Sequence, residues 1–294
     1  MAAKAKKSDG PIVEEVLFRS DSAFLCLLVN HRTKFIRVID FRAGALPAKR
    51  LFIQSVAKRE GIEKVITLVE KDEVSSWTRV GFVREGTIPG FYKRSDGHLC
   101  GCVIGDKTAS IEVSDAGVKL ADRTINQAKK IIKDFPEKIK GLSVHEVEAS
   151  EAETARNQAV KKGIALNTFD TFGRDAERFH YDCSLRRSKT NYLSAEFQDC
   201  FGHSLVEVLR RPDTDNERLA IVGALGVMCD DLKERGIISA FGFAPSDDVD
   251  MAAAYLGAGF RKTGLLAGGI PVGDERKDAI LWSRKLANPG QDDD

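Results

Sequence analysis

The sequence contains the same order of helices and strands twice, and this repetition limits the folds open to it more than any other feature. Over residues 46–92 the pattern predicts a helix, a short apolar strand, a second helix ending before Gly81 and Phe82, and another strand. The order returns over residues 216–284, where the second helix ends before Gly259 and Phe260. A chain with this repetition is expected to form two related units.

The segments that precede the two copies differ. Three short β-rich segments precede the first copy, at residues 12–18, 24–30 and 35–41. Polar residues separate them, which favours an antiparallel meander. The second copy follows a predicted strand, a helix and three strands, at residues 142–147, 148–166, 178–185, 192–198 and 203–209. The second unit is therefore expected to be complete and the first to be a truncated version of it.

These patterns predict the organisation of the whole chain. Residues 115–135 have apolar positions at helical spacing, so a helix is expected to connect the two units. The expected divisions are a polar tail, a truncated unit, a linker helix, a complete unit and a second tail, at residues 1–10, 11–105, 106–141, 142–287 and 288–294. The predicted fold class is α/β, or α+β, with two mixed β-sheets in tandem that are flanked by helices.

Composition limits the possible partners. Lys and Arg number 45 and Asp and Glu 44, and the net charge of +1 does not favour nucleic acid or an anionic membrane. No run approaches the roughly 18 apolar residues of a membrane-spanning helix, and no apolar stretch follows the basic N-terminus, so a cytoplasmic protein is expected. Cys100 and Cys102 are too closely spaced for the usual zinc pair, so no metal site is predicted.

Two segments carry a resemblance to a known family. The first unit ends in Val83-Arg-Glu-Gly-Thr-Ile-Pro-Gly-Phe-Tyr92, and the second in residues 259–265 followed by Ile280-Leu-Trp282. With the order of two unequal units, these segments make the chain resemble the GNAT superfamily of acetyltransferases. Within it, the chain is similar to the β-lysine acetyltransferase family, which also has a truncated unit ahead of a complete one. The resemblance implies transfer of acetyl from acetyl-CoA to a small, amino-acid-like amine.

The resemblance also implies where acetyl-CoA would bind. Val208 and Leu209, at the end of a strand, would lie along the pantetheine arm. The next loop would receive the pyrophosphate, through backbone N–H groups at the start of a helix. In the family this loop contains glycines, but here the matching positions are Asp215, Asn216, Glu217 and Arg218.

Two interpretations of this loop remain. Side chains at Arg210, Arg211 and Arg218, together with Asn216 at the helix start, would bind an anion in place of the missing glycines. Alternatively, the segment is an ordinary helix start, with Thr214 or Asp215 as the N-cap residue. Acidic residues in a first helical turn are typical of the second interpretation.

Tyr255 and Glu207 are the candidate catalytic residues. Tyr255 stands four residues before Gly259, where the superfamily commonly has a tyrosine that protonates the leaving thiolate. The first unit has Trp77 at the matching place, so any activity is expected in the second unit. Glu207 is the candidate base. The alternatives are that Tyr255 only packs against the sheet, and that Glu207 and its neighbour Glu196 lie on a solvent-facing side.

Two functions therefore remain open. The first is a GNAT-like N-acetyltransferase that uses acetyl-CoA and a small amine, with Tyr255 and Glu207 as catalytic residues. The second is a catalytically inactive GNAT-fold protein, a pseudoenzyme that acts as a binding, scaffold or regulatory module, since the cofactor loop has lost its glycines. A nucleic-acid binder is not favoured, because the sequence lacks basic charge and an aromatic-basic pattern.

Overall fold

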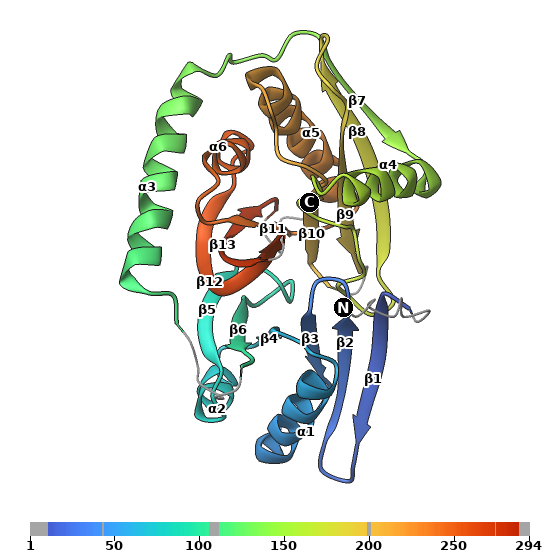
Figure 1. Cartoon of the computed structure of the whole chain (residues 1–294), viewed down its shortest axis with the longest axis vertical. Helices are drawn as coiled ribbons and strands as arrows, with labels where there is room; N and C mark the ends of the chain where they lie inside the picture. The colour runs from blue at the N-terminus through green and yellow to red at the C-terminus, as the bar shows by residue number, and fades with distance from the viewer. Residues whose placement is uncertain (1–10, 43, 106–111, 199–200, 274, 288–294) are drawn as a thin grey trace, which may run out of the picture.

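A computed structural model describes residues 11–42, 44–105, 112–198, 201–273 and 275–287. The predicted tails at 1–10 and 288–294, and the first part of the linker at 106–111, lie outside these residues. Within the described chain, thirteen strands form one sheet in the order β1-β2-β3-β4-β6-β5-β12-β13-β11-β10-β9-β8-β7 (Figure 1). The predicted α/β class is confirmed, and the strands of both halves belong to a single mixed sheet flanked by helices.

The first half begins with the predicted meander. Its elements are β1 (Val13–Arg19), β2 (Phe24–Asn30), β3 (Phe35–Asp40), α1 (Leu46–Arg59), β4 (Lys64–Val69), α2 (Val74–Arg79), β5 (Val83–Ile88) and β6 (Gly97–Val103). Strands β1, β2 and β3 are antiparallel neighbours, as expected, and α1 crosses over to place β4 parallel to β3. A connection of this kind is the usual way to join parallel strands.

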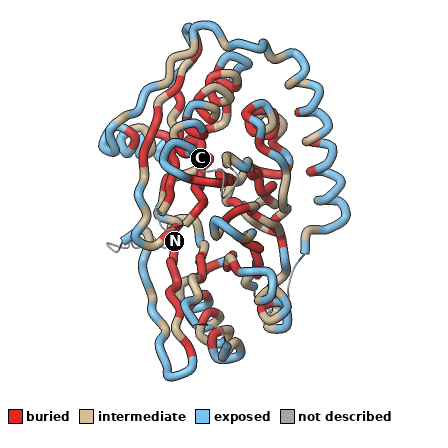
Figure 2. The backbone as a smooth tube through the Cα atoms, turned by 180° about the vertical axis from the view of Figure 1, so that it is seen from behind, coloured by how far each residue is buried: buried red, intermediate tan, exposed pale blue. Residues whose placement is uncertain are grey.

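The second half follows a connecting helix. Its elements are α3 (Asp115–Ile131), the 3₁₀ turn η1 (Ile132–Asp134), β7 (Leu142–Val147), α4 (Ala149–Lys161), β8 (Glu177–Leu185), β9 (Asn191–Phe197), β10 (His203–Val208), α5 (Asp215–Glu234), β11 (Ser239–Pro245), α6 (Val249–Gly257), β12 (Arg261–Val272) and β13 (Glu275–Lys285). This is the predicted order: strand, helix, three strands, helix, strand, helix and two strands. Helix α3 is exposed along most of its length (Figure 2).

One helix is shorter than predicted. The pattern indicated a helix to Leu166, but α4 ends at Lys161. Gly163 adopts a left-handed φ of 68°, and the Ile164 N–H donates to the Ala159 carbonyl at 3.0 Å. A left-handed glycine just beyond the last turn is a common helix terminator. Residues after Gly163 are thereby released into a loop that packs, like α4, on the Tyr192 and Glu196 face of the sheet.

Strand pairing between the two halves occurs at one pair of glycines. Strand β5 pairs with β12 only where Gly86 lies opposite Gly264. A Cβ atom on Gly86 would lie 2.8 Å from Leu281 Cδ2 and 3.0 Å from the Gly264 Cα, so a side chain at this position would push the strands apart. The small size of both residues allows the sheet to continue from one half into the other.

Contacts of the meander with the loop after α4 and with the start of β13 show that the sheet curls. Asn30, at the end of β2, donates from Nδ2 to Asp170 Oδ2 at 3.0 Å. Arg37 on β3 donates to the Phe172 carbonyl at 2.7 Å. Arg276, at the start of β13, donates to the Thr33 carbonyl at 2.5 Å. The meander of the first half therefore closes over one face of the second half.

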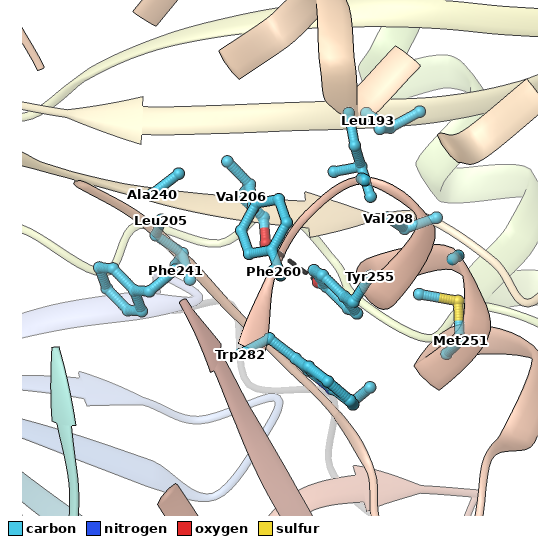
Figure 3. Packing of buried hydrophobic residues seen from close by; sticks show 14 of the residues in the cluster. Leu193, Leu205, Val206, Val208, Ala240, Phe241, Met251, Tyr255, Phe260 and Trp282 are labelled. Atoms are coloured by element: carbon cyan, nitrogen blue, oxygen red, sulfur yellow. Dashed lines mark hydrogen bonds between the residues drawn. The ribbon is translucent and has the colours of Figure 1, made fainter. Parts of the chain in front are cut away.

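The hydrophobic core forms two main clusters. The larger lies beneath α5 and α6, and its centre includes Tyr255, Phe260 and Trp282, all at most 1% exposed (Figure 3). The smaller lies between α1 and strands β2–β4 and includes Trp77 and Phe82, whose rings meet edge to face. No helix in the described part of the chain is long and apolar enough to cross a membrane.

Candidate functional site

A cavity of about 290 Å³ lies where the two halves close on each other. The first half contributes residues of β2 and β3, including Asn30 and Phe35. The second half contributes the loop after α4 and parts of β10, β11, β12 and β13, including Glu207 and Phe243. Neither half could form this cavity alone, because each supplies only one side of its wall.

The cavity opens where two parallel strands separate. Strands β10 and β11 pair only from His203–Leu205 to Ser239–Phe241. Beyond this point the strands diverge, and Glu207 on β10 and Phe243 on β11 both line the cavity. Backbone groups at such a fork have lost their cross-strand partners and need others.

Glu207 is the carboxyl group at this fork. Its Oε2 accepts from Arg178 Nη1 at 2.7 Å, and its side chain is 14% exposed. Among the described residues, Oε1 has no hydrogen-bond partner. Burial raises the pKa of Glu207 to about 7, against the lowering effect of Arg178. The carboxyl group therefore changes charge near neutral pH.

Arg178 connects Glu207 to the loop that covers it. Its Nη1 also donates to Ser194 Oγ at 2.7 Å, and its Nη2 donates to Glu196 and to the Asp170 carbonyl. Glu196 in turn accepts from the backbone N–H of Phe172 at 3.0 Å. The expectation that Glu196 and Glu207 face solvent is wrong, because the loop after α4 covers this side of the sheet.

Tyr255 lies behind the fork and is fully buried. Its hydroxyl donates to the Val206 carbonyl of β10 at 3.4 Å, and its ring stacks on Trp282 (Figure 3). A Cβ atom on Gly242 would lie 2.5 Å from this hydroxyl, so the glycine leaves room for it. Tyr255 does not line the cavity, and burial raises its pKa. It is placed at the fork, on the core side.

A carboxylate occupies the start of α5, where the resemblance implied a phosphate. Thr214 is the N-cap residue, and its Oγ1 accepts from the Glu217 N–H at 3.2 Å. Glu217 is 2% exposed, and its Oε2 accepts from the Asp213 N–H at 3.0 Å. This is the ordinary helix start that the sequence offered as an alternative. The residues present do not fit a pyrophosphate, because a buried acidic side chain lies in the first turn and accepts from the Asp213 N–H just before it.

The three arginines proposed for anion binding all have acidic partners. Arg210 donates from Nη1 to Glu217 at 2.8 Å, and Arg211 pairs with Asp248 at 2.9 Å. Arg218 pairs with Asp215 and Asp250. Asn216 is exposed in the first turn of α5. The positive charges near the helix start are therefore neutralised within the chain.

The strand end expected to hold the pantetheine arm is bonded to the chain itself. Val208 and Leu209 are both buried. Asn167 Nδ2 donates to the Val208 carbonyl at 2.8 Å, and the Leu166 N–H donates to the Leu209 carbonyl at 2.7 Å. Two backbone acceptors at this end of β10 thus already have donors from the loop after α4.

Sequence reasoning missed the residues that this loop brings to the site. Asp170 accepts from Thr168 Oγ1 at 2.7 Å and pairs with Arg32 at 3.2 Å. Phe169 has a φ of 52°, which is unusual for a bulky residue and marks a constrained turn. The only signal was the cluster of aromatic and charged residues at 169–175, because its partners come from β2 and β8, far away in the sequence.

Comparisons with known proteins find likenesses in structure only. No protein-family profile matches the sequence, and no curated protein matches it. A spermidine N-acetyltransferase from Vibrio cholerae, in complex with CoA and spermine, superposes with a TM-score of 0.40 at 8% identity, over 50% of this chain and 97% of that chain. The ribosomal-protein-S18-alanine N-acetyltransferase from Escherichia coli has a TM-score of 0.36 at 15% identity, over 52% and 99%. Each likeness spans about half of this chain.

Proposed function

We propose that this chain binds a small amine in the cavity between its two halves, with Glu207 as the group that pairs with the amine. The observation that carries the proposal is that Glu207 lines the cavity while its Oε1 has no hydrogen-bond partner among the described residues. A partly buried carboxylate gains from a cationic donor, which supplies both charge and a hydrogen bond. Arg178 is shared between Glu207 and Glu196.

The order of elements supports a GNAT-like framework for this site. From β7 to β13 the order matches that of a complete acetyltransferase unit, as the sequence resemblance implied. We therefore assign residues 142–287 to a complete unit, 11–105 to a truncated unit and 106–141 to the linker. In this framework the cavity at the fork is the acceptor side, where an amine would lie.

Two features of the segment where acetyl-CoA would bind favour amine binding without acetyl transfer. Glu217 accepts from the Asp213 N–H just before α5, and Asn167 donates to the Val208 carbonyl at the fork. A CoA molecule would have to displace both, and its phosphates would meet the negative charge of Glu217. This chain is accordingly proposed to be an amine-binding pseudoenzyme.

Acetyl transfer to the bound amine is the second candidate, and the placement of Tyr255 favours it. The Tyr255 hydroxyl and the Glu207 carboxyl both lie along β10 at the fork, at Val206 and one residue further on. A carboxyl with a pKa of about 7 is suited to take a proton from an amine near neutral pH. Acetyl-CoA, when bound, would supply the acetyl group.

Amine binding is expected to depend on pH through Glu207. An ammonium ion pairs with the carboxylate, so affinity should fall about tenfold per pH unit below 7. Glu207→Gln should remove this dependence and weaken binding at pH 8 by at least tenfold. Calorimetric titration of primary amines at pH 5, 6, 7 and 8 measures both effects. Glu177→Gln, at the exposed start of β8, is the matched control. Equal affinity at all four pH values would exclude Glu207 as the amine partner.

Titration with acetyl-CoA separates the two candidates. The pseudoenzyme should give no heat up to millimolar acetyl-CoA, whereas an acetyltransferase should bind it and form an acetylated amine. In the second case Tyr255→Phe should lower turnover by about 10²-fold or more, with a stability loss near 1 kcal/mol for the single hydrogen bond. Normal turnover in this variant would remove Tyr255 from the reaction.

A further inference from the structure

The charges that line the cavity do not balance. Its wall contains three guanidinium groups, of Arg32, Arg37 and Arg276, and two carboxyl groups, of Asp170 and Glu207. Arg32 pairs with Asp170 at 3.2 Å, and Glu207 pairs with Arg178, which stands outside the wall. Two guanidinium groups, those of Arg37 and Arg276, are left without a carboxylate partner in the cavity.

Arg276 is the more accessible of the two. Its Nε donates to the Gly268 carbonyl at 2.8 Å and its Nη1 to the Thr33 carbonyl. Its nearest carboxylate, that of Glu63, is 3.8 Å away and 52% exposed, so the attraction is weak. Its Nη2 is buried and has no hydrogen-bond partner among the described residues. A buried donor without a partner destabilises the folded chain, and a ligand that accepts from it removes that cost.

Arg37, which is more deeply buried, also has a guanidinium nitrogen without a hydrogen-bond partner. Its guanidinium lies 4.2 Å from the centre of the Phe172 ring, and its Nε is also buried without a partner. Burial lowers the pKa of Arg37 to about 10 against the raising effect of nearby Glu196, and it lowers the pKa of Arg276 against the raising effect of Glu63. Both groups therefore carry positive charge in surroundings that disfavour it, and a negative group in the cavity would stabilise them.

We propose that the cavity contains a subsite for an anionic group, a carboxylate or a phosphate, which Arg276 binds. This inference rests on the proposed use of the cavity as a ligand site. The ligand would then carry an amine for Glu207 and an anionic group for Arg276. Phe35 and Phe243, which line the same cavity, provide apolar wall for an apolar body. Arg276 connects the β12–β13 hairpin to Thr33 of the first half. Both halves therefore position the guanidinium group that would bind the anionic group of the ligand.

The experiment uses three probes of one size that lack an amine: phenylacetate, phenyl phosphate and 2-phenylethanol. Calorimetric titration of the whole chain at constant ionic strength should give at least tenfold tighter binding of one anionic probe than of the alcohol. The preferred anion identifies the group as carboxylate or phosphate. Arg276→Gln should reduce this preference at least fivefold. Arg261→Gln, on the exposed start of β12, should leave it unchanged.

Two outcomes would overturn the subsite. One is equal binding, or no binding, of the anionic and neutral probes by the unaltered chain, which needs no variant. The other is an unchanged preference in Arg276→Gln with an unchanged thermal midpoint. If that variant is unstable, Arg276→Lys keeps the charge and tests whether the planar group is needed. Since no probe carries an amine or an acyl donor, failure of amine binding at Glu207 would not affect this result.

Discussion

Replacing Lys64 by alanine is expected to lower the free energy of unfolding by about 3–5 kcal/mol. Its ammonium group is fully buried and lies 2.6 and 2.7 Å from the two carboxyl oxygens of Glu85, which is itself 3% exposed. Removing the cation leaves the Glu85 charge in a space that cannot hydrate it. Burial raises the pKa of Glu85 and lowers that of Lys64, which shows how strongly each group depends on the other.

The same pair joins the two halves of the chain. Glu85 Oε1 also accepts from the Ala267 N–H of β12 at 3.0 Å, next to the junction of β5 with β12. Gly101 leaves room for the pair, because a Cβ atom there would overlap the Glu85 carboxylate. Loss of the pair should therefore weaken the junction of the halves as well as the first half.

Urea unfolding measures this prediction. Lys58→Ala, an exposed lysine in the last turn of α1, is the control and should change stability by less than about 0.5 kcal/mol. The double variant Lys64→Met with Glu85→Gln should recover most of the loss, since it removes both charges and keeps an acceptor for Ala267. A loss below 1 kcal/mol for Lys64→Ala would show that water reaches Glu85.

Replacing Arg178 by alanine is expected to cost about 3–5 kcal/mol at pH 8, because two carboxylates lose their shared cation. Arg178 is 15% exposed, and it bonds to Glu196 and Glu207 and to the Asp170 carbonyl. The loop that covers the cavity should loosen together with Glu207. The variant should also lose amine affinity, since Glu207 and the loop after α4 both depend on this side chain.

The titration of Glu207 determines whether the stability cost of Arg178→Ala rises or falls with pH. Burial raises the pKa of Glu207 from its ordinary 4.5 to about 7. A raised carboxyl pKa favours the folded state fully below about 4.5, and the benefit is lost as the pH rises through 7. Without Arg178 the pKa should rise further, so the loss should continue to higher pH. The cost of Arg178→Ala should thus be smaller at pH 5 than at pH 8.

Urea unfolding at pH 5 and pH 8 tests both statements. Arg187→Ala, in the exposed turn between β8 and β9, removes the same charge without a buried partner and should have little effect at either pH. An equal cost for Arg178→Ala at the two pH values would mean that Glu207 does not titrate in this range.

Local patterns in the sequence predicted the elements well. The three segments at 12–41 form β1, β2 and β3, and Thr214 caps α5 as one of the two residues proposed. Strand alternation and capping depend on neighbours within a few residues, so they can be recognised without the fold. The placement of Glu196 was predicted wrongly for the opposite reason: the loop that covers it comes from residues 166–173.

By itself, the sequence determined the order of the elements and the α/β class, together with the acidic start of α5 that argues against a phosphate site. Only the tertiary structure decided that both halves share one sheet through Gly86 and Gly264, and that Arg276 and Glu207 face one cavity. Periodicity specifies which face of an element is apolar, but it cannot specify which distant element will cover that face. In this chain the curl of the sheet brings the first half against one face of the second, and the cavity forms between them.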